Sequence, residues 1–214
     1  MTEDTATPSP ETADIAWLRN LAQEGSSSPP HGGSILLAAG LIWGTASVAH
    51  WTIVSEMITV DPVAYGVLWG AAGVAFAVAL IVLIARLKRR GGVETAANRA
   101  FASVWSALGW GMFSLFSALM LLEVSRTGQT EMASWSLAIP SIIMAFYGVG
   151  WAVSATMLRR SSLWFMAIGA FIAAPVLAMM SGSAAQYLAY AACLFLLMAV
   201  PGFLLMRAAR TAKA

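Results

Sequence analysis

The sequence predicts an all-α fold, a polytopic membrane helical bundle with six transmembrane helices. Hydrophobic residues make up 59% of the 214-residue chain and charged residues only 10%, and the mean hydropathy is +0.76. Apolar stretches of about 18 to 25 residues recur, each long enough to cross a hydrocarbon core about 30 Å thick. Basic residues gather after every second stretch, which favours six spans arranged as three helical hairpins.

The first 33 residues are predicted to form a cytoplasmic tail. Thr, Pro, Ser and acidic residues dominate its beginning, a composition that cannot bury an apolar face and is typical of disorder. A short amphipathic helix is expected at about 10–24, because Pro10 suits a first helical position and Gly25 suits the residue after the last. The membrane domain then covers 34–207, and 208–214 form a second cytoplasmic tail.

The spans are placed where apolar runs meet charged or turn-forming residues. Glu56 closes the first run, Asp61-Pro62 turns the chain, and Ser181-Gly182-Ser183 makes a tight turn before the last. The predicted spans are 34–56, 63–85, 100–122, 132–158, 162–180 and 184–206.

Basic residues set the predicted orientation. Lys and Arg near span ends stay on the cytoplasmic side, and a six-span arrangement leaves only Arg126 on the other side. Both termini are therefore expected to be cytoplasmic, in the cytoplasmic (inner) membrane of a bacterium. Because orientation explains the basic residues, we do not predict nucleic acid as a partner. The residues that set the topology are Arg86, Lys88, Arg89, Arg90, Arg159, Arg160 and Arg207, with Arg99, Arg210 and Lys213 on the same side.

Small residues and prolines indicate how the spans pack. Three spans share a GxxxG-like pattern, which lets helix backbones approach closely in lipid: Gly40 with Gly44, Gly66 with Gly70, and Ala107 with Gly111. Proline within a helix removes a backbone hydrogen bond and can kink it. Kinks are therefore expected at Pro140, Pro175 and Pro201.

The spans carry few groups capable of chemistry. No acidic residue falls at mid-membrane and no nucleophile has a base beside it, so we predict neither an enzyme nor a bound cofactor. His50 is the one ionisable group well inside a span. Two interpretations stay open: a neutral imidazole bonded to a neighbouring helix or a lipid headgroup, and a contact to quinone or haem.

A metal site is a weaker alternative at the outer ends of the first two hairpins. His50, Glu56 and Glu123 can all be metal ligands, as can Asp61 and Glu131, but their spacing matches no ligand motif. We therefore predict no metal.

One segment suggests a relationship to other proteins. The run Ile15-Ala16-Trp17-Leu18-Arg19-Asn20-Leu21-Ala22-Gln23-Glu24-Gly25, with Gly32-Gly33 leading into the first span, resembles the start of uncharacterised small polytopic inner-membrane proteins of alphaproteobacteria. The resemblance covers about the first 55 residues and implies no activity.

Three functional hypotheses follow. The first is an accessory or scaffold subunit of a membrane complex, whose partners are the lipid bilayer and either another membrane protein or further copies of this chain. The second is a small-solute or lipid transporter that acts as a homo-oligomer and flexes at its prolines. The third is a quinone- or redox-associated membrane subunit that uses His50.

Overall fold

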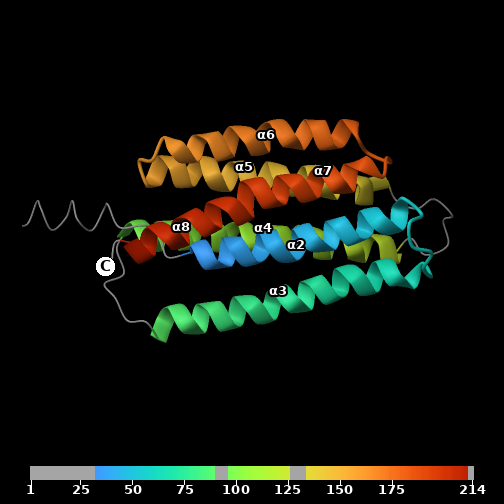
Figure 1. The fold of residues 1–214 in the computed structure, drawn as a ribbon, viewed down its shortest axis with the longest axis horizontal. Helices are drawn as coiled ribbons and strands as arrows, with labels where there is room; N and C mark the ends of the chain where they lie inside the picture. Colours follow the sequence, from blue (N-terminus) through green and yellow to red (C-terminus); the bar gives the residue numbers. More distant parts are fainter. Residues whose placement is uncertain (1–31, 90–95, 126–133, 212–214) are drawn as a thin grey trace, which may run out of the picture.

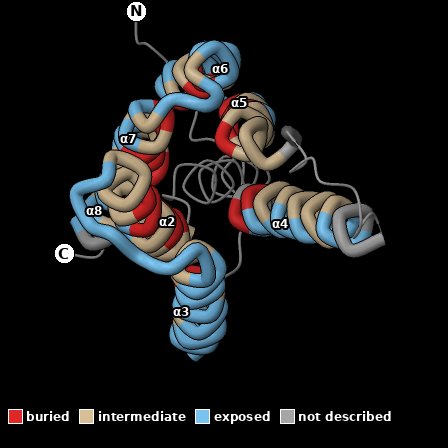
Figure 2. The backbone as a smooth tube through the Cα atoms, turned by 90° about the vertical axis from the view of Figure 1, so that its right-hand side faces the viewer, coloured by how far each residue is buried: buried red, intermediate tan, exposed pale blue. Residues whose placement is uncertain are grey.

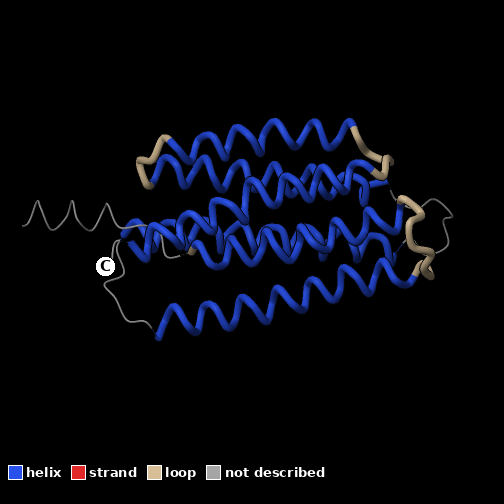
Figure 3. Tube along the Cα trace, in the orientation of Figure 1, coloured by secondary structure: helices blue, strands red, loops and turns tan. Residues whose placement is uncertain are grey.

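The computed structural model describes residues 32–89, 96–125 and 134–211, and over these residues the chain is helical, without strands (Figure 3). The predicted tail helix at 10–24, and with it Arg90 and Arg126, falls outside the described residues. Six helical segments are long and apolar enough to cross a membrane. The prediction of an all-α, multi-pass membrane fold is thus confirmed.

Five helices make up the first five spans, and the sixth span is composite. The spans are α2 (Gly33–Val54), α3 (Val63–Arg89), α4 (Ala96–Ser125), α5 (Ile139–Met157) preceded by the 3₁₀ helix η1 (Ser134–Ala138), and α6 (Ser162–Met179). The last span joins α7 (Ala185–Leu194), the π-helical turn η2 (Phe195–Ala199) and α8 (Val200–Thr211).

The C-terminal ends of α3 and α2 can be explained by the residues found there. α3 continues to Arg89, beyond its predicted end at residue 85, because Arg and Lys are good helix formers and suit a helix C-terminus. α2 ends at Val54, and Glu56, two residues beyond that end, adopts a left-handed φ of 57°. Its N–H donates to the Ile53 carbonyl at 3.0 Å and the Met57 N–H donates to the Thr52 carbonyl at 3.1 Å, the two bonds of a Schellman cap.

The basic ends of the helices lie together. α3 and α8 end, α2 and α4 begin, and α5 turns into α6 at one end of the bundle, whereas the turns after α2 and α6 lie at the other (Figure 1). Arg86, Arg159 and Arg207 therefore share one end, and Glu56 and Asp61 lie at the opposite end.

The core is formed by four spans. α2 packs along α7, η2 and α8, and α5 packs extensively along α6. Trp151, Met144, Leu177, Leu194 and Met198 are the largest apolar side chains that are fully buried there. Buried residues face one another across these elements (Figure 2). The first and last spans are thus neighbours although they are far apart in the sequence.

Helices α3 and α4 stand apart from this core. α3 packs mainly against α2 and α4 mainly against α5, and the two do not pack extensively against each other. In α3 only Ala72 is buried, and in α4 the buried residues among the described side chains are Asn98 and Phe101. Figure 2 shows them as two exposed arms. We call them the α3 and α4 arms.

The packing differs from three separate hairpins of consecutive spans. The most extensive contact joins α5 and α6, which belong to different predicted hairpins, and the last span packs against α2 more than against α6. The reason is that small residues let backbones approach wherever they face each other, regardless of chain order.

Candidate functional site

His50 lies at the junction of three helices. It belongs to the last turn and a half of α2 and is only 9% exposed. The rings of Tyr65 and Trp69 reach it from α3, and that of Tyr187 from α7. We call His50, Tyr65, Trp69 and Tyr187 the His50 cluster.

A hydrogen bond fixes the His50 imidazole. The indole nitrogen Nε1 of Trp69 donates to Nδ1 of His50 at 2.8 Å. An accepting Nδ1 carries no proton, so the ring is neutral and its proton is on Nε2. Nε2 has no hydrogen-bond partner among the described residues, and it is not one of the fully buried atoms that lack a partner. One donor therefore remains available at this position.

Ring contacts hold the cluster in place. The imidazole stacks on Tyr187 with ring centroids 3.8 Å apart and an interplanar angle of 22°, and Tyr65 lies tilted at 5.0 Å. The hydroxyl of Ser47, which is fully buried, donates to the backbone carbonyl of Tyr187 at 2.8 Å and so ties α7 to α2 at this level. Trp43 stacks on Trp69 at 6.0 Å and extends the aromatic face toward the middle of the spans.

The cluster lies near the acidic end of the bundle. His50 is four residues before the end of α2, and Tyr65 and Tyr187 are each the third residue of their helix. At a rise of about 1.5 Å per residue, these positions are roughly 3–6 Å inside the helix ends, the depth at which aromatic side chains meet lipid headgroups. Nε2 of His50 can therefore donate a hydrogen bond to a group in a mainly apolar environment.

The candidate metal ligands do not assemble within the described part of the chain. Among those residues, no group of three His, Cys, Asp or Glu side chains could hold a metal ion. Glu56 lies in the turn after α2 and Asp61 caps α3 by accepting the Val63 N–H at 2.9 Å. The side chain of Glu123 and all of Glu131 fall outside the described residues.

The glycines of the predicted packing motifs have different surroundings. A methyl group on Gly40 would collide with the backbone of Ala199, and one on Gly44 would lie 2.5 Å from the Phe195 ring. Among the described residues, Gly66 and Gly70 on the α3 arm have no such neighbour within 4 Å, and Gly111 has only Phe146 at 3.6 Å. Ala107 on the α4 arm is exposed.

The three prolines also differ. Pro140 lies in the first turn of α5, directly after η1, a position that suits proline at the start of a helix. Pro175 lies inside α6, and Pro201 is the second residue of α8, directly after the π-helical turn η2. Single π turns and prolines are both places at which helices kink.

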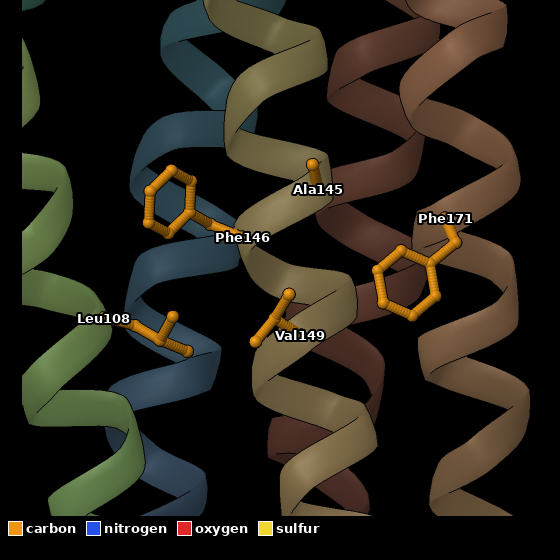
Figure 4. A pocket seen from close by; sticks show the side chains of 5 residues that line it. All are labelled: Leu108, Ala145, Phe146, Val149 and Phe171. Atoms are coloured by element: carbon orange, nitrogen blue, oxygen red, sulfur yellow. The ribbon is translucent and has the colours of Figure 1, made fainter.

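Two apolar grooves lie between helices. One of about 250 Å³ is lined by Leu108 of α4, Phe171 of α6 and three α5 side chains, Ala145, Phe146 and Val149 (Figure 4). The other, of about 470 Å³, lies between α2 and α3, and Thr45 is its one residue with a polar side chain. Hydrocarbon chains suit both linings better than a polar solute does.

Sequence reasoning singled out His50 but missed Tyr65, Trp69 and Tyr187. A usable signal existed: Tyr65 and Tyr187 stand close to the outer ends of the predicted spans 63–85 and 184–206, the same end near which His50 lies in the span 34–56. Comparisons of the chain with protein families, with curated proteins and with solved structures found no match.

Proposed function

We propose that the protein is an accessory or scaffold subunit of a membrane complex, and that the α3 and α4 arms bind its partner. The observation that carries this proposal is the exposure of both arms along nearly their whole length. Each arm packs mainly against one neighbour, α2 or α5. A membrane protein inserted beside the arms would complete their packing, whereas the core spans already contact several neighbours.

The α3 arm carries a face suited to a second helix. Gly66 and Gly70 are one turn apart on the side away from α2, and a methyl group added at either would have no other element of the described chain within 4 Å. Val74 and Ile81 continue this exposed face. Association of helices in lipid depends on such close backbone approach, because there is no water to expel.

The α4 arm offers aromatic side chains for the same purpose. Trp110 and Phe113 are 70% and 65% exposed, and their rings meet edge to face at 5.9 Å. Large aromatic side chains contribute much of the energy of protein interfaces. A partner that contacts both arms would bury these rings together with the glycine face of α3.

The test is gentle extraction of the tagged protein from native membranes, followed by mass spectrometry of what co-purifies. The wild type is compared with a Gly66→Leu/Gly70→Leu double variant and with Ala178→Leu, which places a leucine at an exposed position of α6. We expect a stoichiometric partner with the wild type and the control, and its loss in the double variant. A wild type that purifies as a lone monomer and crosslinks to nothing overturns the proposal.

A second candidate, a lipid transporter acting as a homo-oligomer, is favoured by the two apolar grooves, which suit acyl chains. Pro175 in α6 and the π turn before Pro201 supply points at which helices could flex. Reconstitution in liposomes with fluorescent phospholipids tests this role, since transport requires lipid to change leaflet faster than in empty liposomes.

The orientation proposed with this function has both termini in the cytoplasm of a bacterium. It is supported by the basic side chains at one end of the bundle, among them Arg86, Arg159 and Arg207. Single cysteines placed at Ser183 and Ser161, in a variant with Cys193→Ser, test it with a membrane-impermeant thiol reagent. Labelling of intact cells is expected at 183 and not at 161, and the reverse pattern contradicts the orientation.

A further inference from the structure

We propose that the His50 cluster binds the polar head of a membrane-soluble amphiphile, whose acceptor oxygen takes the hydrogen bond that Nε2 of His50 can donate. The site consists of His50, Tyr65 and Tyr187, with Trp69 as the residue that positions the imidazole. The inference is independent of the proposed accessory role.

The tautomer of the His50 imidazole is fixed by its surroundings. Trp69 occupies Nδ1 through a 2.8 Å hydrogen bond, and the stacked Tyr187 ring holds the imidazole plane. The Nε2 proton therefore has a defined position and direction before any ligand arrives. A donor organised in this way binds an acceptor without first having to be ordered.

Three polar groups of the cluster have no hydrogen-bond partner among the described residues. Within the described chain, neither Nε2 of His50 nor the hydroxyls of Tyr65 and Tyr187 make a hydrogen bond, although the indole of Trp69 and the backbone carbonyl of Tyr187 do. Polar groups in an apolar environment carry a free-energy cost unless they are bonded. An outside acceptor would remove this cost for His50, whose side chain is largely buried.

The His50 cluster lies close to one end of the bundle. His50, Tyr65 and Tyr187 lie within about two turns of the acidic end of the bundle. Phosphate and ester oxygens of phospholipids occur at this depth, and the carbonyl oxygens of an isoprenoid quinone can reach it. Each is an oxygen acceptor attached to an apolar tail, which is the chemistry that a neutral N–H donor among aromatic rings would recognise.

The test uses the fact that the chain has only two histidines, His31 and His50. A His31→Ala variant labelled with ¹⁵N-histidine leaves one imidazole, which can be followed by solid-state NMR in phospholipid nanodiscs. We expect an unprotonated Nδ1 and a protonated Nε2. A contact from the Nε2 proton to ³¹P, or to ¹³C-labelled ester carbonyls, identifies a phospholipid. A saturable shift of Nε2 on addition of decylubiquinone identifies a quinone.

Matched variants separate ligand binding from packing. Tyr65→Phe and Tyr187→Phe keep the rings and remove the hydroxyls, and each is expected to weaken ligand retention by about fivefold, the value of one neutral hydrogen bond. Trp69→Phe should release Nδ1 and give a mixture of tautomers, whereas Trp164→Phe, on α6, should leave the spectrum unchanged. A proton on Nδ1 in the wild type, or an Nε2 proton that contacts neither lipid nor quinone and exchanges with water, overturns the proposal.

Discussion

The indole of Trp151 donates a hydrogen bond of 3.0 Å to the backbone carbonyl of Leu197. In a regular α-helix that carbonyl would accept from residue 201, but residue 201 is proline and has no N–H. A fully buried side chain of α5 thus supplies a donor where the last span cannot. The π turn η2 ends two residues before this proline.

We predict that Trp151→Phe destabilises the fold both by removing this bond and by leaving a cavity where the larger ring was. The variant should lower the free energy of unfolding by about 1–3 kcal/mol for the unpaired carbonyl, with a further contribution from the cavity. Trp164→Phe, at a 43% exposed position of α6, should cost much less. Thermal unfolding in detergent measures both.

A double-mutant cycle tests the role of Pro201 in that bond. Pro201→Ala restores a backbone donor, so the penalty of Trp151→Phe should shrink by about 1 kcal/mol in the Pro201→Ala background. Equal penalties in the two backgrounds would show that the indole does not replace the missing N–H.

Gln186 joins three elements, η1, α6 and α7, at the acidic end of the bundle. Its side chain is fully buried, and Nε2 donates to the Leu137 carbonyl at 2.8 Å and to the Leu177 carbonyl at 3.1 Å. Gln186→Leu should lower the free energy of unfolding by about 2 kcal/mol because both carbonyls lose this donor. Ser183→Ala, an exposed change in the turn before α7, is the control, and equal melting temperatures for the two variants would contradict the prediction.

Glycines with opposite surroundings give a second matched pair. Gly40→Ala places a methyl group against the backbone of Ala199 and should destabilise the fold by about 1–3 kcal/mol. Gly66→Ala meets open space and should be neutral or stabilising by up to about 1 kcal/mol, because alanine favours a helix more than glycine does. If both changes destabilise equally in purified protein, α3 contacts more of its own chain than the structure shows.

Two residues that follow helix ends, Glu56 and Arg159, have a left-handed backbone conformation that glycine adopts more easily. Glu56 and Arg159 have φ values of 57° and 50°, where a side chain costs about 1 kcal/mol or more relative to glycine. Glu56→Gly should therefore raise the melting temperature, and Gly182→Ala, at φ 83°, should lower it. A shift of the same sign in both variants would count against this explanation.

Much of the fold could be predicted from the sequence because the bilayer imposes a length and a composition on each span. Asp61-Pro62 marks the start of α3, and the six apolar runs correspond to the six membrane-length helices. The partners of each helix could not be predicted. Glycine patterns look alike in sequence whether they meet Ala199, as Gly40 does, or open space, as Gly66 does.

The surroundings of His50 were equally hard to predict. With nine tryptophans and four tyrosines in the chain, no spacing distinguishes Trp69 or Tyr187 from the other aromatic residues. Which aromatic residues surround His50 depends on α7 packing against α2, a contact between residues about 140 positions apart. The depth of Tyr65 and Tyr187 within their spans was the part that the sequence could indicate.

The exposure of the α3 and α4 arms predicts a protein partner beside them, and site-specific photo-crosslinking in living membranes can detect that partner. Benzoylphenylalanine would replace Ile81 on α3, Phe113 on α4 or Ile172 on α6, which are 68%, 65% and 60% exposed. We predict a defined protein adduct at 81 and 113, from another membrane protein or a second copy of this chain, and lipid adducts alone at 172. Lipid adducts alone at all three positions would contradict the claim that the arms bind a protein partner.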